Sequence, residues 1–208
     1  MDSTTALAWA DNIYDVVGVV NFQYGSKHNA REHEAVLSIS AFYNTNLTII
    51  DLSFINQHFK SDLLSSGGDI PDGHYADESM KRTVVPFRNG IMLSIAAGLA
   101  ESQGAEAIVL GNHFGDHAIY PDCRKEFINP MREAIRLGTY AEIQVLSPFV
   151  DSDKADIAKI GHGLGVPFHL TWTCYKGGER HCGKCGSCVE RREAFQLAQV
   201  PDPTVYDV

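Results

Sequence analysis

The sequence predicts an α/β protein built on a doubly wound, mostly parallel, Rossmann-like sheet. Four short apolar runs are typical of strands buried on both faces, and helical patterns separate them. Strands that alternate with helices favour parallel pairing through right-handed crossovers. The predicted strands span residues 16–20 (VVGVV), 47–50 (LTII), 107–110 (AIVL) and 143–146 (IQVL).

The helices follow from the spacing of apolar side chains between these runs. Residues 29–43 and 88–103 carry an apolar residue at every third or fourth position, which places one apolar stripe on each helix. A further amphipathic helix is expected over residues 4–10, with Asp2 or Ser3 as its N-cap.

Polar side chains follow the predicted strands, where ligands of a parallel α/β sheet usually bind. His28 comes after the first strand, and Asp116, Asp122 and Arg124 come after the third. A simple connector would need only turn-forming residues, whereas these side chains can hydrogen-bond or titrate. Their clustering at strand ends indicates a functional site there.

A glycine-rich stretch at residues 65–69 (SSGGD) invites a second interpretation as a phosphate-binding loop. It has no predicted strand before it and no predicted helix after it. Because phosphate loops depend on the helix N-terminus that follows them, we expect an ordinary loop here.

Four cysteines near the C-terminus have the spacing of a zinc site. The pattern is Cys-x7-Cys-x2-Cys-x2-Cys, with Gly183 and Gly186 able to form the turns. Tight Cys-x2-Cys pairs are more typical of zinc than of structural disulfides. Four thiolates leave no open position for water or substrate, so the predicted zinc is structural. The predicted ligands are Cys174, Cys182, Cys185 and Cys188.

Two further residues bear on this prediction. His181 stands beside Cys182 and could replace a cysteine as ligand, but four cysteines already complete a tetrahedron. Cys123 lies outside the spacing of the four, and we expect it to be packed or adjacent to substrate.

Composition limits the class of protein. The chain has 208 residues, 44% of them hydrophobic, which suits one compact domain, with room for a small metal-bound appendage. The formal net charge of −9 disfavours a nucleic-acid binder. No secretion signal opens the chain and no run reaches the roughly 20 apolar residues of a membrane span, so we expect a cytoplasmic protein without a membrane partner.

The chain resembles the 7-cyano-7-deazaguanine synthases, members of the N-type ATP pyrophosphatase or PP-loop group. The resemblance extends over nearly the whole chain, and two motifs carry most of its specificity. These are the block YPDCRKEF at residues 120–127 and the sequence LTWTCY at residues 170–175, just before the other cysteines. The further matches are MDS at 1–3, YG with His28, GHY at 73–75, VVPFRN at 84–89, KADI at 154–157 and DPT at 202–204.

The resemblance implies a fold and an activity. The fold would be that of the adenine nucleotide alpha-hydrolases, with an ATP-pyrophosphatase-like domain over residues 1–170 and a zinc-binding segment with a C-terminal helix over residues 171–208. Such enzymes use ammonia and two ATP to convert 7-carboxy-7-deazaguanine into the nitrile, through carboxylate adenylation, amide formation and dehydration. Magnesium, cytoplasmic location and a homodimer are implied as well; whether the product serves RNA or DNA modification stays open.

The resemblance also implies roles for individual residues. Asp2 and Ser3 would end the loop that holds the ATP phosphates with magnesium. Arg88 would clamp phosphate or the substrate carboxylate, and Lys154 would stabilise pyrophosphate. Asp122 and Glu126 would accept hydrogen bonds from the guanine-like edge, with Asp116 as an alternative for that task or for the metal. Further nucleotide contacts are expected from Tyr24, His28, Gly111, Asn112, Asp116 and Glu126.

Two departures from the family pattern generate their own expectations. The chain opens inside the phosphate loop, without the glycines and the strand that should precede it. We therefore expect upstream residues in the native product, and impaired ATP binding in a chain that begins at Met1. Phe87 occupies a position where Asn or Gly is more usual, and it could reshape the pocket entrance.

Two alternatives belong to other classes. One is a zinc-bound binding protein that keeps the scaffold without catalysis. The other is a related PP-loop enzyme that thiolates or amidates a different substrate. Thiolation usually needs reactive cysteines near the nucleotide, and Cys123 alone lies outside the zinc set.

Overall fold

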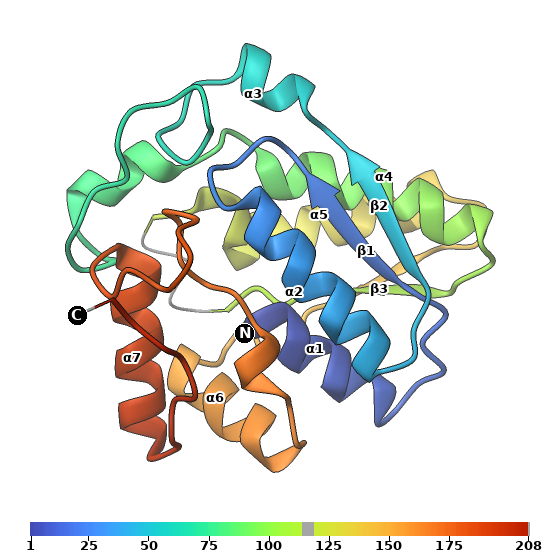
Figure 1. Ribbon diagram of the computed structural model, residues 1–208. Helices are drawn as coiled ribbons and strands as arrows, with labels where there is room; N and C mark the ends of the chain where they lie inside the picture. Colours follow the sequence, from blue (N-terminus) through green and yellow to red (C-terminus); the bar gives the residue numbers. More distant parts are fainter. Residues whose placement is uncertain (114–118, 208) are drawn as a thin grey trace.

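The computed structural model describes residues 1–113 and 119–207, and it has the predicted α/β architecture with parallel strands (Figure 1). The elements are α1 (Asp2–Asp11), β1 (Val19–Gln23), α2 (Asn29–Phe42), β2 (Leu47–Asp51), α3 (Phe54–His58), the 3-10 helix η1 (Glu78–Thr83), α4 (Arg88–Ser102), β3 (Ala107–Val109), η3 (Pro121–Cys123), α5 (Lys125–Gly138), β4 (Gln144–Leu146), α6 (Lys154–Gly163), η4 (Phe168–Leu170) and α7 (Gly186–Ala198).

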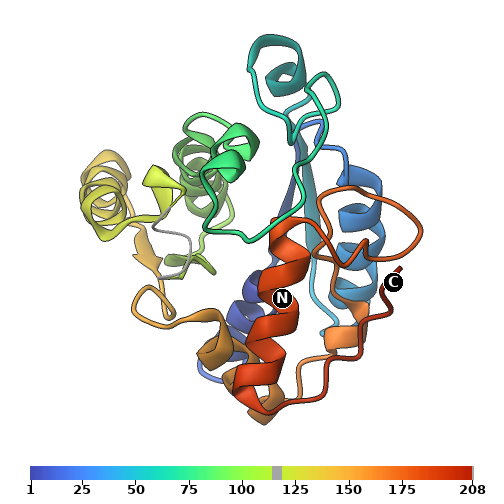
Figure 2. The same ribbon diagram turned by 90° about the vertical axis from the view of Figure 1, so that its left-hand side faces the viewer.

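The strands form two parallel pairs. β1 pairs with β2 from Val19↔Leu47 to Gln23↔Asp51, and β3 pairs with β4 from Ala107↔Gln144 to Val109↔Leu146. Within the described residues no ladder joins the two pairs, so the predicted sheet is present as two halves. In Figure 2, α4 and α5 lie on one side of the molecule, α2 lies on the other, and α7 lies between them.

The first strand differs most from its prediction. It begins at Val19 instead of residue 16 and continues to Gln23. Its bounds follow the partner strand, because the pairing with β2 starts at Val19, which donates to the Asn46 carbonyl at 2.7 Å, and ends at Gln23, which accepts from Leu52 at 2.7 Å. The end of the apolar run VVGVV therefore marks the start of β1, which continues through the polar residues Asn21 and Gln23.

Three apolar clusters hold the elements together. One joins α1, α6 and α7 and includes Phe149, Ile157 and Phe195. Another packs α4 and α5 on β3 and β4, with fully buried Ile143 at its centre. The third lies between β1–β2 and the C-terminal segment, and it includes Cys174, Cys185 and Cys188. The cysteines are thus part of the core.

The predicted N-cap of the first helix is wrong. α1 starts at Asp2, Met1 is its N-cap, and no side chain caps it. The Asp2 carboxylate does not turn back on the first N–H groups because its Oδ2 lies 3.3 Å from Lys154 Nζ. The first turn consequently keeps N–H groups that no side chain satisfies.

Residues 65–69 form a loop flanked by neither a strand nor a helix. The Lys27 ammonium donates to four backbone carbonyls, those of Asp62, Leu64, Gly67 and Gly68, at 2.6–3.2 Å. Carbonyls that face a cation make a poor phosphate cradle, which agrees with the interpretation as an ordinary loop.

One stretch, Glu78–Ser102, is long and apolar enough by composition to cross a membrane, a test that core helices of soluble proteins also pass. The structure divides it into η1 and α4, and Phe87 between them has a left-handed φ of 54°. α4 has 15 residues, about 22 Å at 1.5 Å per residue, and it buries Leu93 and Ala97 in the core.

A buried arginine anchors the C-terminal segment. Arg191 on α7 has no exposed surface. Its guanidinium donates to the hydroxyls of Thr171 and Thr173 at 2.7 and 3.1 Å, to the Phe168 carbonyl at 3.1 Å and to the Asp202 carboxylate at 3.3 Å. One side chain therefore ties α7 to η4, to the strand-less segment 171–173 and to the C-terminal tail.

We expect Arg191→Met to lower the free energy of unfolding by about 3–5 kcal/mol, because four acceptors lose their donor and two of them, the Phe168 carbonyl and the Thr171 hydroxyl, belong to buried residues. Arg192→Met is the matched control, since Arg192 is the exposed neighbour on α7 and its guanidinium lies 5.4 Å from the centre of the Tyr206 ring. That change should cost less than about 1 kcal/mol. Urea unfolding of both variants measures the difference; equal losses would contradict the anchoring role.

Candidate functional site

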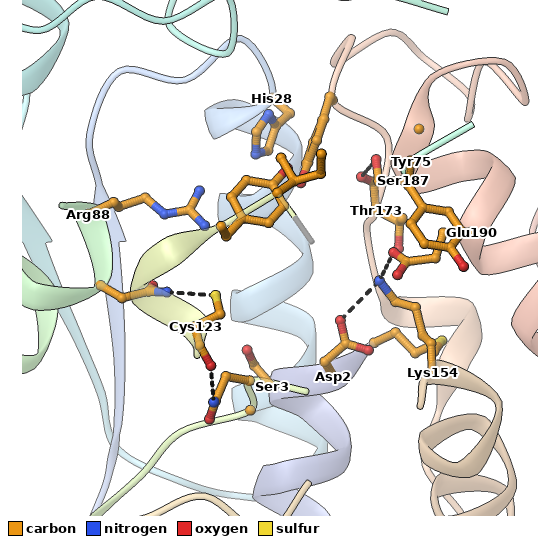
Figure 3. Close-up of a pocket in the computed structure, with 18 of the residues that line it drawn as sticks. Asp2, Ser3, His28, Tyr75, Arg88, Cys123, Lys154, Thr173, Ser187 and Glu190 are labelled. Carbon is orange, nitrogen blue, oxygen red and sulfur yellow. Dashed lines mark hydrogen bonds and ion pairs between the residues drawn. The ribbon is translucent and has the colours of Figure 1, made fainter. Parts of the chain in front are cut away.

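A pocket of about 270 Å³ lies where the ends of β1 and β3 face the N-terminus of α1 and the C-terminal segment (Figure 3). Most predicted site residues meet there although they are scattered along the chain. The predicted residues that line it are Asp2, Ser3, Tyr24, His28, Arg88, Gly111, Asn112 and Lys154.

The N-terminus of α1 forms one wall, and Gly111 lets it approach β3 closely. A Cβ on Gly111 would lie 2.9 Å from both the Ser3 nitrogen and the Ser3 Cα. Only glycine fits this approach without displacing backbone. The uncapped first turn and the helix dipole make this wall suitable for an anion such as phosphate.

Lys154 is the first residue of α6, and a capping box of Asp153 and Asp156 starts the helix there. Its ammonium lies between two carboxylates, contacting Asp2 Oδ2 at 3.3 Å and hydrogen-bonding Glu190 (Figure 3). Burial raises the pKa of Asp2, but the charges of Lys154 and His113 outweigh it and hold that pKa at about 2. The positive charge of Lys154 is therefore already compensated.

Arg88 is the second cation of the pocket, and its surroundings differ. The guanidinium donates to the Tyr24 hydroxyl at 3.2 Å and lies 5.6 Å from the centre of that ring. Burial raises the pKa of Tyr24, so this partner is a neutral phenol. Within the described residues no carboxylate comes within 4.0 Å of Arg88, which leaves a full positive charge facing the pocket.

Asp122 serves the backbone instead of the pocket. Its Oδ2 accepts from the backbone N–H of Asn89 at 2.8 Å, in the first turn of α4, and Asp122 does not line the pocket. The carboxylate thus stabilises the N-terminus that carries Arg88. Neither member of the proposed base-reading pair lines the pocket, and Glu126 is exposed on α5. Asp116 lies outside the described residues.

Phe87 does not line the pocket either. Its ring packs on Phe127 in an edge-to-face arrangement with centres 5.4 Å apart, and a Cβ at Gly90 would collide with it at 2.4 Å. The expected effect on the pocket entrance is therefore not supported. Cys123 does line the pocket; it is buried, and Asn89 donates to its Sγ at 3.1 Å.

Four cysteines form a compact cluster beside the pocket. The Sγ atoms of Cys174, Cys182, Cys185 and Cys188 lie within 4.8 Å of one another, and those of Cys182 and Cys188 are 3.9 Å apart. Tetrahedral Zn–S bonds of about 2.3 Å would separate sulfurs by roughly 3.8 Å, so the cluster has the size of a metal site. The backbone N–H groups of residues 182 and 185 point at the sulfurs of Cys174 and Cys182 at 3.4 and 3.3 Å.

His181 is not one of these ligands. Its Nε2 accepts from the backbone N–H of Thr173 at 3.1 Å, and its ring stacks on Trp172. Burial, followed by the charge of Arg191, lowers the pKa of His181 to about 4 and keeps the ring a neutral acceptor. The prediction of four cysteine ligands without histidine agrees with this geometry.

Sequence reasoning missed several pocket residues. No sequence spacing pairs Glu190 with Lys154, because 36 positions separate them and only the packing of α7 on α6 joins them. Glu32 is the missed residue that the sequence could have indicated, because its position four residues after His28 places the two side chains on the same face of a helix. The remaining lining residues that carried no predicted role are Met1, Tyr75, Met80, Asn89, Leu110, Ile119, Tyr120, Trp172, Thr173, Tyr175, Gly186 and Ser187.

We expect Gly111→Ala to lower the free energy of unfolding by about 1–3 kcal/mol, because the methyl group must displace the backbone of α1. Gly98→Ala is the control: it lies inside α4 with no atom within 4 Å of the added methyl group, and it should stabilise the protein by about 0.5–1 kcal/mol. Thermal and urea unfolding would detect the opposite signs. A neutral Gly111→Ala would contradict the close approach.

A family model and several known proteins that are similar to this chain all indicate the same family. The family described as "Queuosine biosynthesis protein QueC" matches residues 1–199. The 7-cyano-7-deazaguanine synthase of Porphyromonas gingivalis (strain ATCC 33277) is 54% identical over 211 residues, which cover all of this chain and 93% of the relative. The synthase of Desulfotalea psychrophila is 48% identical, and the match covers 99% of this chain and 94% of the relative. The synthase of Rhizobium johnstonii is 46% identical, and the match covers 100% of this chain and 88% of the relative. With identity at this level along its whole length, the chain belongs to the QueC family of queuosine biosynthesis proteins.

Proposed function

We propose that this protein is an ATP-dependent 7-cyano-7-deazaguanine synthase, which converts 7-carboxy-7-deazaguanine and ammonia into the nitrile. A carboxylate is a poor electrophile, so adenylation with release of pyrophosphate makes AMP its leaving group. Ammonia displaces AMP to give the amide, and a second adenylation followed by loss of AMP gives the nitrile. Relatives of the same name support the proposal, and the pocket offers the charges that both activations need.

The observation that carries the proposal is the unequal state of the two cations. Lys154 is compensated by Asp2 and Glu190, whereas Arg88 hydrogen-bonds the neutral phenol of Tyr24 and, among the described residues, has no carboxylate within ion-pair distance. A guanidinium without a carboxylate partner favours an anionic ligand that it can bind in bidentate fashion. We assign the substrate carboxylate to Arg88 and the ATP phosphates to the N-terminal turn of α1 beside Gly111.

Magnesium fits the wall near α1. Asp2 Oδ1 and Asn112 Oδ1 are buried pocket oxygens with no hydrogen-bond partner among the described residues. Oxygen ligands of this kind are the ones that magnesium prefers, and it usually bridges a carboxylate to substrate phosphates. Asp2 would hold the ion, which would neutralise polyphosphate charge; Lys154 would position the Asp2 carboxylate through the other oxygen.

Zinc fits the four cysteines, whose separations suit a tetrahedron of thiolates. A closed set of four sulfurs supplies no catalytic chemistry, so its role would be structural. We further infer that ammonia is the nitrogen donor, and that the protein works as a homodimer in the cytoplasm. The resemblance of the sequence to the family supports these three points.

The test of the function combines the purified protein, produced with any residues that its gene encodes upstream of Met1, with ATP, magnesium, ammonium and 7-carboxy-7-deazaguanine. We expect the nitrile, with two AMP formed for each nitrile. Tight ligand binding without AMP release would support a non-catalytic binding protein instead. AMP release with another acid or with a sulfur donor would support a different PP-loop reaction.

Arg88→Gln distinguishes the carboxylate from the triphosphate as its ligand. Loss of a charge-assisted hydrogen bond costs about 1.5–3 kcal/mol, so kcat/KM for the carboxylate should fall about 10- to 100-fold. When the neutral amide intermediate is supplied as the substrate, kcat/KM should fall much less. Equal losses with both substrates would assign Arg88 to ATP. Arg136→Gln, on the outer surface of α5, is the control and should leave both rates unchanged.

Cys185→Ser tests the metal. We expect the protein to lose most of its bound zinc and several kcal/mol of stability, because metal binding to such a cluster contributes on the order of 10 kcal/mol to folding. Cys123→Ser should keep one zinc per chain, since Cys123 lies outside the cluster. Mass spectrometry of the metal content and urea unfolding provide the measurements. Full zinc content in Cys185→Ser would contradict the assigned ligands.

A further inference from the structure

His28 is a buried histidine whose ring is fixed from two sides. It is 3% exposed and immediately precedes α2, following the turn at Gly25. Its ring stacks on Tyr175 with centres 5.4 Å apart and an angle of 27° between the planes. Its Nε2 lies 3.4 Å from Glu32 Oε1, one turn further along the helix. The position and rotation of the imidazole are therefore set before any ligand binds.

The other ring nitrogen of His28, Nδ1, has no hydrogen-bond partner among the residues that the structure describes. Nδ1 is buried, and His28 is one of the residues that line the pocket. Nε2 faces Glu32 Oε1 at 3.4 Å, and in the tautomer that carries its proton on Nε2 the lone pair lies on Nδ1. A buried acceptor without a donor is unfavourable in the free protein, which points to a ligand that supplies the missing proton.

The proposed reaction releases protons at defined bonds. When ammonia attacks the acyl adenylate, a C–N bond forms, AMP leaves with the electron pair of the broken C–O bond, and one proton leaves the former ammonia. When the adenylated imidate collapses, the C–O bond breaks again, AMP departs, and the N–H proton is lost as the third C–N bond forms. The two C–O-breaking steps therefore each need a proton acceptor at the nitrogen.

Three other charged groups of the pocket suit this task less well. Lys154 is an ammonium bound to two carboxylates, and Arg88 stays protonated. The Asp2 carboxylate has a pKa of about 2, far below that of a base matched to neutral pH. Figure 3 places His28 on the same side of the pocket as Arg88, across from Lys154 and Glu190. The carboxylate carbon is the atom that ammonia attacks, so a substrate carboxylate held by Arg88 would be on the same side of the pocket as His28.

We propose that His28, oriented by Glu32, is the catalytic proton acceptor of the two ammonia-derived steps: Nδ1 takes a proton from the attacking ammonia and later from the imidate nitrogen. The pairing of a carboxylate with the far nitrogen of an imidazole is the arrangement of general bases in hydrolases. The inference rests on the proposed function, because it assigns a residue to that reaction.

His28→Gln is the decisive variant, since its side-chain amide can still donate to Glu32 while the lone pair at Nδ1 is lost. Two reactions are compared. Without ammonium, exchange of labelled pyrophosphate into ATP in the presence of 7-carboxy-7-deazaguanine reports adenylation alone. With ammonium, amide and nitrile are measured. We expect exchange within about 3-fold of wild type and amide formation at least about 100-fold slower, the usual contribution of a general base.

His33→Gln is the matched control on the same helix. His33 bonds to Gln23 at 2.8 Å and does not line the pocket, so both reactions should stay at the wild-type rate. If His28→Gln does not fold, Glu32→Gln replaces it, because its amide oxygen can still accept from Nε2. That variant should slow amide formation about 10-fold or more while exchange continues.

The outcomes separate the two hypotheses. Equal loss of exchange and of amide formation in a folded His28→Gln protein assigns His28 to binding and overturns the inference, as does an unchanged rate of amide formation. Absence of exchange in the wild-type protein, in the presence of magnesium and the carboxylate, overturns the proposed function and the inference with it.

Discussion

The pocket depends on how a segment without regular structure is held in place. Residues 171–185 contain no helix or strand, yet Trp172, Thr173 and Tyr175 line the pocket. Their backbone cannot rely on a ladder, so side chains satisfy it: Trp172 donates to the Cys174 carbonyl at 2.8 Å, and Ser187 donates to the Thr173 carbonyl at 3.0 Å. The thiol cluster and Arg191 fix both ends of this arrangement.

This anchoring gives the proposed zinc site a structural purpose in an enzyme of this family. Cys185 immediately precedes α7, and the first two residues of that helix, Gly186 and Ser187, line the pocket. Glu190, one turn further, reaches Lys154 on α6. A displacement of the cysteines would therefore move α7 and disturb the charge balance around Lys154. The metal would act on the reaction only through the position of this wall.

The sequence supports some of this arrangement better than the rest. The strands, α2, α4 and the cysteine cluster were predictable because periodicity and short spacings are local. The role of Glu190 was not predictable, because it meets Lys154 only through the packing of helices that are distant in the sequence. The role of Asp122 was not predictable either, because its carboxylate accepts a hydrogen bond from the first turn of α4, a contact that only the folded chain creates. The division of the strands into two separate pairs could not be predicted either, because apolar runs show which segments are strands but not which strand edges pair.

The neutral hydrogen-bond partner of Arg88 suits a substrate whose charge changes during the proposed reaction. The ligand enters as a carboxylate, continues as a neutral amide and leaves as a neutral nitrile. A guanidinium that depended on a substrate anion would become an unpaired buried charge after the first half. Tyr24 provides a permanent hydrogen bond and a ring face, so Arg88 keeps a partner when the anion disappears. A carboxylate hydrogen-bonded to Arg88 would also hold the guanidinium in place, but it would repel the incoming acid. The neutral phenol of Tyr24 holds the guanidinium without repelling the acid.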